Sequence, residues 1–323
     1  MKKILIAAAV AAASATTLCS MNLEEPAAMP RPLRDGDKIA IVSPAGPIDS
    51  AIVYEAADTL RAVGYEVEVM PHAIGRVGRY AASDSGRLAD LRAALTDTTV
   101  RAVLCARGGY GAVHLLDSLA GLPLRDDPKW LIGFSDISAL HALLASRNIA
   151  SVHGNMCKHL ALGPSDADNA LMLDVLRGHK PVYHWDADTL NREGSVRGRL
   201  LGGNLAVIAE LINTPYDVIQ PGTVLFIEEV EEPVYKIERI MYQLRLSGVL
   251  PRLAGLVVGQ FTDCHGDDSY ATAERMIADM VAPYDFPVAF NAPIGHVDHN
   301  VPVLQSATVL LDVGRDGTTL SFE

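Results

Sequence analysis

The chain has 323 residues, of which 49% are hydrophobic and 20% are charged, and it carries a formal net charge of −12 at pH 7. This composition is typical of a folded globular protein, and the length exceeds that of one typical core, so we expect two domains. The acidic excess argues against a nucleic acid partner, because such a partner needs a surface rich in Lys and Arg. The four cysteines are widely spaced without a CxxC pair, which predicts neither a disulfide framework nor a zinc ribbon.

Residues 1–20 have the pattern of an export signal. Lys2 and Lys3 precede an apolar run that is too short to span a membrane comfortably, and small residues follow at 13–15. We therefore expect this segment to be removed and the mature protein to lie in the periplasm or the cell envelope. The alternative is translation from Met21, which would leave the protein in the cytoplasm.

Cys19 raises the separate question of a lipid anchor. Leu18 stands directly before it, where lipidation sites usually carry a small residue, so cleavage near Ala15 competes with lipidation. No later segment is long and apolar enough to predict a stable membrane span.

Strand and helix patterns alternate over residues 33–160, which we expect to form an N-terminal α/β domain. The expected elements, in chain order, are a strand at 38–46, a helix at 50–65, a strand at 66–71, a helix at 86–97, a strand that runs into a glycine loop at 100–112, a strand at 130–134, a helix that ends near 144 and a strand at 149–155. This order predicts a doubly wound, largely parallel sheet whose functional residues gather beyond the carboxyl ends of its strands.

The pattern weakens over 161–195, a polar and turn-rich stretch that we expect to be a linker. Residues 196–323 should then form a second domain that is smaller and richer in strands. Its expected elements are strands at 222–230, 253–261, 287–296 and 306–313, and a helix at 234–248 whose apolar residues share one face.

Ser135 stands in a tight turn between the strand at 130–134 and the helix that follows it. A serine on such a turn is lifted clear of the sheet, and free N–H groups at the helix start can stabilise an oxyanion beside it. This is the arrangement of a nucleophile elbow. Ser135 could instead cap the helix, as could Asp136, and Ile137 stands where the G-x-S-x-G elbow has its second glycine.

A glycine-rich loop follows the strand at 100–105 and contains Gly108, Gly109 and Gly111. The backbone of such a loop can approach a ligand closely and direct its N–H groups toward it. The spacing matches neither the phosphate-binding nor the dinucleotide-binding glycine motif, which argues against a bound nucleotide.

Several motifs together resemble the L,D-carboxypeptidase family of serine peptidases, which includes murein tetrapeptide carboxypeptidases and microcin C immunity peptidases. The resemblance extends from about residue 33 to the end of the sequence. In chain order the motifs are IAIVSPAGPI, ARGGYGA, PKWLIGFSDISALHALL, SVHG, GRLLGGNLAVIAELINTPY, LFIEEVEEPVYKIERIMYQL and PIGH.

Position by position, the resemblance implies a catalytic triad of Ser135 as nucleophile, Glu228 as acid and His296 as base. Glu228 follows an apolar strand, which can hold its carboxylate against an imidazole, and the ring can take and return the serine proton. The acids that come after it are expected to be solvated loop charges, namely Glu229, Glu231 and Glu232.

The resemblance also implies a reaction, acyl transfer to Ser135 with cleavage between an L-centre and a terminal D-amino acid in a murein tetrapeptide. The L-centre is diaminopimelate or an equivalent residue. The candidates for the oxyanion hole are the backbone N–H groups of Asp136, Gly108 and Gly109. The candidates for binding the terminal carboxylate of the substrate are Arg107 and Arg239. Since the triad spans both expected domains, the active site should lie at their interface.

Two other functions stay open. A related amidase that degrades a microcin C-like peptide-nucleotide toxin would keep the triad and change the pocket, whereas a non-catalytic muropeptide-binding protein would not need an intact triad.

Metal ligands could gather at 263–268, or at His296 and His299, but neither group has the spacing of a zinc site. We expect no metal and no cofactor, a muropeptide as the substrate, and either a monomer or a homodimer.

Overall fold

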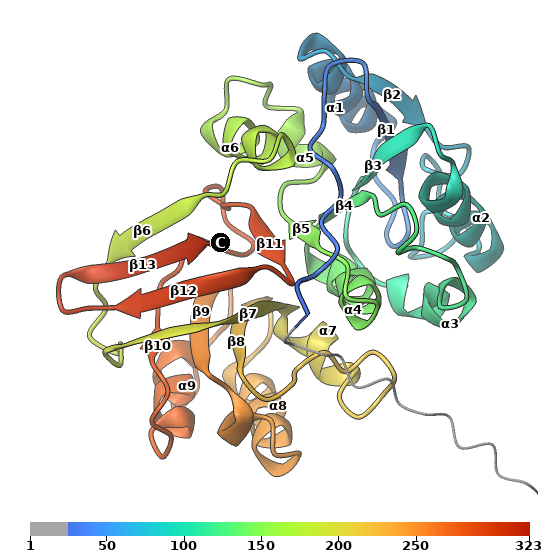
Figure 1. Cartoon of the computed structure of the whole chain (residues 1–323). Helices are drawn as coiled ribbons and strands as arrows, with labels where there is room; N and C mark the ends of the chain where they lie inside the picture. Colours follow the sequence, from blue (N-terminus) through green and yellow to red (C-terminus); the bar gives the residue numbers. More distant parts are fainter. Residues whose placement is uncertain (1–24) are drawn as a thin grey trace, which may run out of the picture.

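The structure is a computed structural model that describes residues 25–323. The expected signal segment at 1–20 lies outside these residues. Within the described part of the chain, no helix is both long enough and apolar enough to cross a membrane. Figure 1 shows two β-sheets side by side, with helices packed against each.

The first sheet is doubly wound and largely parallel, as predicted. Its strand order is β11-β5-β4-β3-β1-β2, and neighbouring strands are parallel except for the pair β11 and β5. The strands are β1 (Lys38–Val42), β2 (Glu66–Val69), β3 (Val100–Cys105), β4 (Trp130–Gly133), β5 (Ser151–His153) and β11 (Val303–Gln305). β11 comes from the far end of the sequence, which the periodicity of 33–160 could not indicate.

Helices cover both faces of this sheet. They are α1 (Ser50–Ala62), α2 (Asp84–Thr96), α3 (Leu116–Leu119), α4 (Ser138–Ser146), α5 (Cys157–Leu160) and α6 (Ala167–Leu176), with short 3-10 helices η1 (Ala112–Leu115) and η2 (Ser135–Ile137). Alternate residues of β1 serve the two faces, because Ile39 packs in the cluster that contains Leu60 of α1 and Ala40 packs with Leu91 of α2. This two-sided burial explains the continuous apolar run of β1.

The second sheet is mixed and has the order β10-β9-β8-β7-β12-β13-β6. Its strands are β6 (Val182–Asp186), β7 (Gly194–Asn204), β8 (Thr223–Val230), β9 (Gly255–Thr262), β10 (Val288–Ala289), β12 (Thr308–Val313) and β13 (Gly317–Phe322). The helices of this part are α7 (Leu205–Glu210), α8 (Val234–Leu246), η3 (Leu250–Arg252) and α9 (Ala273–Val281). The expected richness in strands is therefore present.

Strand β8 explains how the second sheet meets the first. Leu225 and Ile227 pack in a cluster with the apolar residues of α8 and α9. Val224 and Phe226 point to the opposite face and pack in a cluster that also contains residues of the first sheet and of α1. One apolar cluster thus joins the two sheets, and the next residue on this shared face of β8 is Glu228.

The segment 161–195, which we expected to be a linker, contains regular structure. It holds α6, whose Met172 and Leu173 belong to the cluster shared by both sheets, and β6, which pairs with β13. Many polar residues of this stretch lie in the loops around α6 and β6, and two of those within α6, Asp168 and Asn169, are buried.

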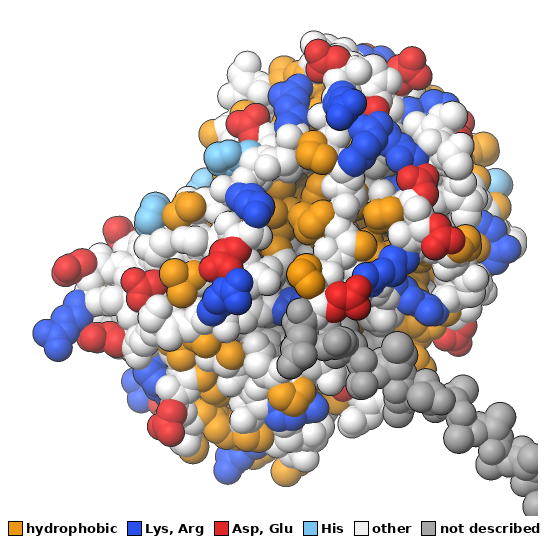
Figure 2. All heavy atoms as spheres, viewed as in Figure 1, with side chains coloured by type: hydrophobic (Ala, Val, Ile, Leu, Met, Phe, Trp, Pro, Cys, Tyr) orange, Lys and Arg blue, Asp and Glu red, His pale blue; other side chains and the backbone are white. Residues whose placement is uncertain are grey.

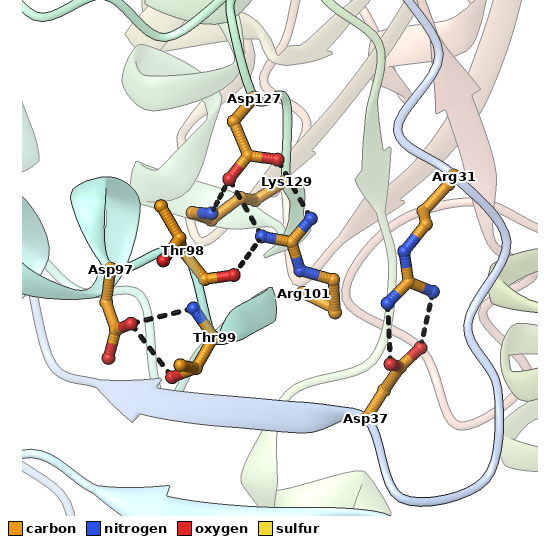
Figure 3. Close-up of polar contacts among 8 residues, drawn as sticks. All are labelled: Arg31, Asp37, Asp97, Thr98, Thr99, Arg101, Asp127 and Lys129. Atoms are coloured by element: carbon orange, nitrogen blue, oxygen red, sulfur yellow. Dashed lines mark hydrogen bonds and ion pairs between the residues drawn. The ribbon is translucent and has the colours of Figure 1, made fainter.

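Ion pairs hold the amino ends of the first sheet's strands, opposite the carboxyl ends of the same strands. Figure 3 shows Asp127 between Arg101 and Lys129, with Nζ of Lys129 2.7 Å from Oδ2 of Asp127, and a separate pair of Arg31 and Asp37. The hydrogen bonds from Arg101 and Lys129 hold the pKa of Asp127 well below its usual range. These pairs stabilise the amino ends of the strands, and the carboxyl ends are the edge where functional residues are expected.

Charged side chains of both signs are interspersed over the face of the molecule shown in Figure 2. Apolar side chains line a hollow near the centre of that face. This face therefore has no extended field of a single sign that would steer a charged ligand from a distance.

Candidate active site

Ser135 occupies a strained turn at the carboxyl end of β4. Its φ is +66°, in the left-handed region that non-glycine residues rarely adopt, and η2 and α4 follow directly. Such strain at a strand-to-helix turn is typical of a nucleophile elbow. Ile137, which stands in place of the usual glycine, is fully buried in the cluster between the first sheet and α4.

The glycine loop after β3 lies directly against this turn. A Cβ atom on Gly108 would be 2.7 Å from Cβ of Ser135, 2.9 Å from its Oγ and 3.4 Å from the amide nitrogen of Asp136. Only glycine permits this approach. The N–H groups of Gly108 and Gly109 donate to no acceptor among the described residues, and Gly108 lies against the Ser135–Asp136 turn.

Two buried charges hold the glycine loop in place. The Asp136 carboxylate accepts the N–H of Ala112 at 2.8 Å, and burial raises the pKa of this carboxyl. Arg87 of α2 is buried and donates to the carbonyl oxygens of Gly111, at 2.9 Å, and of Pro44. Sequence reasoning missed Arg87, because an arginine in an amphipathic helix is usually solvent-exposed.

Glu228 and His296 form the second half of the site. Nδ1 of His296 lies 2.7 Å from Oε2 of Glu228, whose side chain is fully buried at the end of β8. Gly295, with φ of +131°, permits this contact, because a Cβ there would be 3.0 Å from Cβ of Glu228. The predicted pairing of these two residues is present in the structure.

The environment of His296 favours its protonated form. Burial acts to lower the pKa of His296, but the hydrogen bond and charge of Glu228, together with the charges of Glu229 and Glu231, raise it above its ordinary value. A base with a raised pKa accepts a proton more readily once it is neutral.

The expectation that Glu229 is a solvated loop charge is wrong. Its side chain is buried, accepting the N–H of Ala206 at 2.9 Å and the Nδ2–H of Asn204 at 2.7 Å, so it caps α7. The N–H of Asn204 in turn donates to Oγ of Ser138 on α4 at 3.0 Å. This chain of hydrogen bonds connects the helix that follows the nucleophile to the strand that carries Glu228.

The alternation along β8 could have indicated this burial. Glu228 follows Phe226 on the face shared by the two sheets, and Glu229 follows Ile227 on the face covered by helices. Glu231 is exposed as expected, whereas Glu232 is only partly exposed and pairs with Lys236 at 3.0 Å.

A cavity of about 1110 Å³ opens at this place and is lined by residues of both parts of the chain. Ser135 and His296 both line it, and the Phe134 ring packs edge-on against the His296 ring with centroids 4.9 Å apart. No hydrogen bond joins Ser135 to His296 within residues 25–323, and such bonds are often long before substrate binds. The predicted site at the interface therefore has a cavity in which a substrate can lie.

Only one of the two arginine candidates lines the cavity. Arg107 lines it and is oriented by a hydrogen bond from Nη1 to the carbonyl oxygen of Pro47 at 2.8 Å. Arg239 does not line it and lies on α8 over the Tyr235 ring, with 5.7 Å from the guanidinium carbon to the ring centroid. The sequence could not distinguish them, because each stands close in sequence to residues that line the cavity, Arg107 beside Gly108 and Arg239 after Glu231.

Two more cations line the cavity and were not predicted, Arg76 and Lys158. His299, the alternative to His296 as a base, instead pairs with Asp168, with Nδ1 2.8 Å from Oδ1, and its side chain is 67% exposed.

Comparisons with known proteins identify the family of the chain. Residues 39–154 match the model of the LD-carboxypeptidase N-terminal domain, and residues 197–311 match that of the C-terminal domain. A putative carboxypeptidase of Synechocystis sp. is 34% identical over 91% of this chain and 96% of its own. The murein tetrapeptide carboxypeptidase of Pseudomonas aeruginosa is 30% identical over 86% of this chain and 94% of its own.

A solved structure shows the same fold. The muramoyltetrapeptide carboxypeptidase from Oxalobacter formigenes superposes with a TM-score of 0.79 at 27% identity, covering 88% of this chain and 98% of its own. The chain belongs to the LD-carboxypeptidase family of peptidases.

Proposed function

We propose that this protein is a serine carboxypeptidase that removes the terminal D-amino acid from a murein tetrapeptide. The observation that carries the proposal is the hydrogen-bonded pair of Glu228 and His296, which opens on the same cavity as the strained Ser135. A nucleophile, a base and an acid that orients the base are the three groups that acyl transfer to serine requires.

The proposed reaction begins when Nε2 of His296 accepts the hydroxyl proton of Ser135. Oγ then attacks the carbonyl carbon of the L-centre, and the resulting oxyanion accepts hydrogen bonds from the N–H groups of Asp136 and the Gly108–Gly109 segment. His296 returns the proton to the leaving amine, and the D-amino acid departs. A water molecule, deprotonated by the same ring, then hydrolyses the acyl-enzyme and regenerates the serine hydroxyl.

Glu228 keeps His296 in the tautomer that this reaction needs. Its carboxylate accepts the Nδ1–H, so Nε2 is left as the free acceptor for the serine proton. The negative charge also stabilises the imidazolium that forms with the tetrahedral intermediate.

Arg107 is our candidate for binding the terminal carboxylate of the substrate. Arg107 lines the cavity, and one N–H of its guanidinium donates to the carbonyl oxygen of Pro47, which leaves other N–H groups for a carboxylate. Its neighbour Gly108 touches the nucleophile, and the terminal carboxylate of the substrate is one residue from the attacked carbonyl.

The test is the release of D-alanine from a defined L-Ala-γ-D-Glu-diaminopimelate-D-Ala tetrapeptide, followed by mass spectrometry. Ser135→Ala should abolish release and leave the melting temperature close to that of the wild type. Ser146→Ala, at the other end of α4 and outside the cavity, is the matched control and should retain activity. Release by Ser135→Ala at the wild-type rate would overturn the serine mechanism. Cleavage of an aminoacyl-sulfamoyl nucleotide in place of the tetrapeptide would favour the toxin-degrading alternative.

A further inference from the structure

Three aromatic side chains form a partly exposed cluster beside the cavity, outside the machinery described above. The ring centroids of Tyr80 and Tyr110 are 6.2 Å apart, and the His114 ring packs edge-on against both, at 5.6 Å from Tyr80 and 5.4 Å from Tyr110. Tyr110 is 43% exposed. We call these three residues the aromatic platform.

The platform is held in place by Arg87, one of the two buried charges that support the glycine loop. The buried guanidinium of Arg87 lies over the Tyr80 ring, 4.9 Å from its centroid. Tyr80 also closes a tight turn with Val77, in which each residue donates its N–H to the carbonyl oxygen of the other. A preorganised surface of this kind loses little conformational entropy when it binds a ligand.

The platform is continuous with the cavity along the chain. Tyr110 directly follows Gly109, and Tyr80 lies in the same loop as Arg76, and both Gly109 and Arg76 line the cavity. The cavity is also larger than the common range for small-ligand sites, about 300–1,000 Å³. A substrate whose cleaved end lies at Ser135 can therefore extend toward the platform.

The chemistry of the platform fits a sugar ring. Tyrosine offers an apolar face with a hydroxyl at its edge, which matches a pyranose, whose C–H groups form apolar faces and whose hydroxyls surround the ring. A peptide released from murein carries such a sugar at the end opposite to its terminal D-amino acid.

The charge beside the His114 ring opposes a phosphorylated ligand at that end of the platform, whereas the exposed Arg79 directly precedes Tyr80 at the other end. Asp84 lies 3.4 Å from Nδ1 of His114, and its side chain is 61% exposed. The cation beside it, Arg87, is fully buried and already donates to two carbonyl oxygens and to Asp84. A carboxylate at the surface repels phosphate and tolerates an uncharged sugar.

We propose that the aromatic platform binds the sugar that is linked to the amino end of the murein peptide. This inference rests on the proposed function and adds to it a subsite for carbohydrate. The enzyme then prefers a glycan-linked tetrapeptide over the free peptide.

The experiment compares two substrates, the free tetrapeptide and the same tetrapeptide carrying N-acetylmuramic acid. The quantity measured is the ratio of kcat/KM for the glycan-linked substrate to kcat/KM for the free one. Tyr110→Ala should lower this ratio by about threefold to tenfold, mainly through KM, which is the usual contribution of one aromatic contact. Tyr110→Phe keeps the ring and should keep the ratio within about twofold of the wild type.

Tyr242→Ala is the matched control, because Tyr242 is also 43% exposed but lies on α8 under Arg245, outside the cavity lining. Its ratio should equal that of the wild type. Tyr80→Ala is a second variant whose substitution lies outside the glycine loop, so it lowers the ratio even where Tyr110→Ala disturbs the loop.

Unchanged ratios in both Tyr110→Ala and Tyr80→Ala would overturn the platform while leaving the peptidase intact. Failure of the wild type to release D-alanine from either substrate would instead overturn the proposed function. The platform would then be judged by calorimetry of Ser135→Ala with the two substrates, in which an equal affinity for both would overturn it.

Discussion

Gly108→Ala tests whether the contact between the glycine loop and Ser135 is required for catalysis. The backbone of Gly108 does not adopt a positive φ, so alanine is conformationally allowed and the effect of the change is steric. The new Cβ would be 2.7 Å from Cβ of Ser135, whereas ordinary contact begins at 3.4 Å. Either the loop or the nucleophile must therefore move by about 0.7 Å.

The expected loss follows from this displacement. A misplacement of about 1 Å can lower a rate about 100-fold, and loss of one oxyanion donor lowers kcat by about 100-fold to 1,000-fold. We expect kcat for D-alanine release to fall by about 100-fold or more, while overpacking lowers the free energy of unfolding by only about 1–3 kcal/mol.

The assay measures kcat and KM on the free tetrapeptide, with the melting temperature recorded for each variant. Gly121→Ala is the control, because a Cβ at Gly121 would meet nothing within 4 Å. A Gly108→Ala enzyme that retains the wild-type kcat would refute the assignment of this loop to the oxyanion hole.

Four further predictions concern pH, metals and location. Activity should rise with pH through an apparent pKa above 6.5, because His296 must be neutral to act as a base. Glu228→Gln should lower both kcat and this apparent pKa. A pH–rate profile whose midpoint does not move in Glu228→Gln would contradict the pairing of Glu228 with His296. Burial lowers the pKa of His141 to about 4, so the neutral form stabilises the fold above about pH 6.5, and this contribution is lost as the pH falls toward 4. Lowering the pH from about 8 to about 5 should therefore lower the free energy of unfolding by about 2 kcal/mol through His141. Thermal melts of His141→Gln should show a smaller loss of stability over the same pH range. Activity should survive prolonged dialysis against EDTA, and loss that zinc restores would indicate a metal site. We propose that the full-length chain is exported and cut between residues 15 and 19, and an unprocessed N-terminus, or a start at Met21 with all of the protein in the cytosol, would overturn this.

Most of the first sheet and the positions of two of the three proposed triad residues could be predicted because each depends on a local signal. Ser135 follows β4 of the first sheet and Glu228 lies near the end of β8 of the second sheet, so apolar runs mark both positions. His296 lies in the loop after β10, beyond the end of the strand that the sequence predicted to reach it. The family motifs then gave these positions their roles.

The features that were missed depend on contacts between distant parts of the chain. Arg87 supports the site through carbonyl oxygens of two separate loops, and no local pattern marks it. Glu229 was predicted to be solvent-exposed because the prediction followed its charge and not its position on the helix-covered face of β8. Arg239 was retained as a candidate because it is close to Glu228 in sequence, but a residue of α8 that is close in sequence need not line the cavity.

Strand β11 has a consequence for how the protein is made. It pairs with β5, with Val303 opposite His153 and Gln305 opposite Ser151, so the first sheet is complete only after nearly the whole chain has left the ribosome. Until then β5 presents an open edge, which can pair with other chains. A fragment that ends at residue 160 would keep the nucleophile and this exposed edge together. Synthesis from the N-terminus therefore assembles the serine's sheet and delivers His296 in the same late step, so a chain interrupted before β11 is exposed to aggregation and does not become a partly active enzyme.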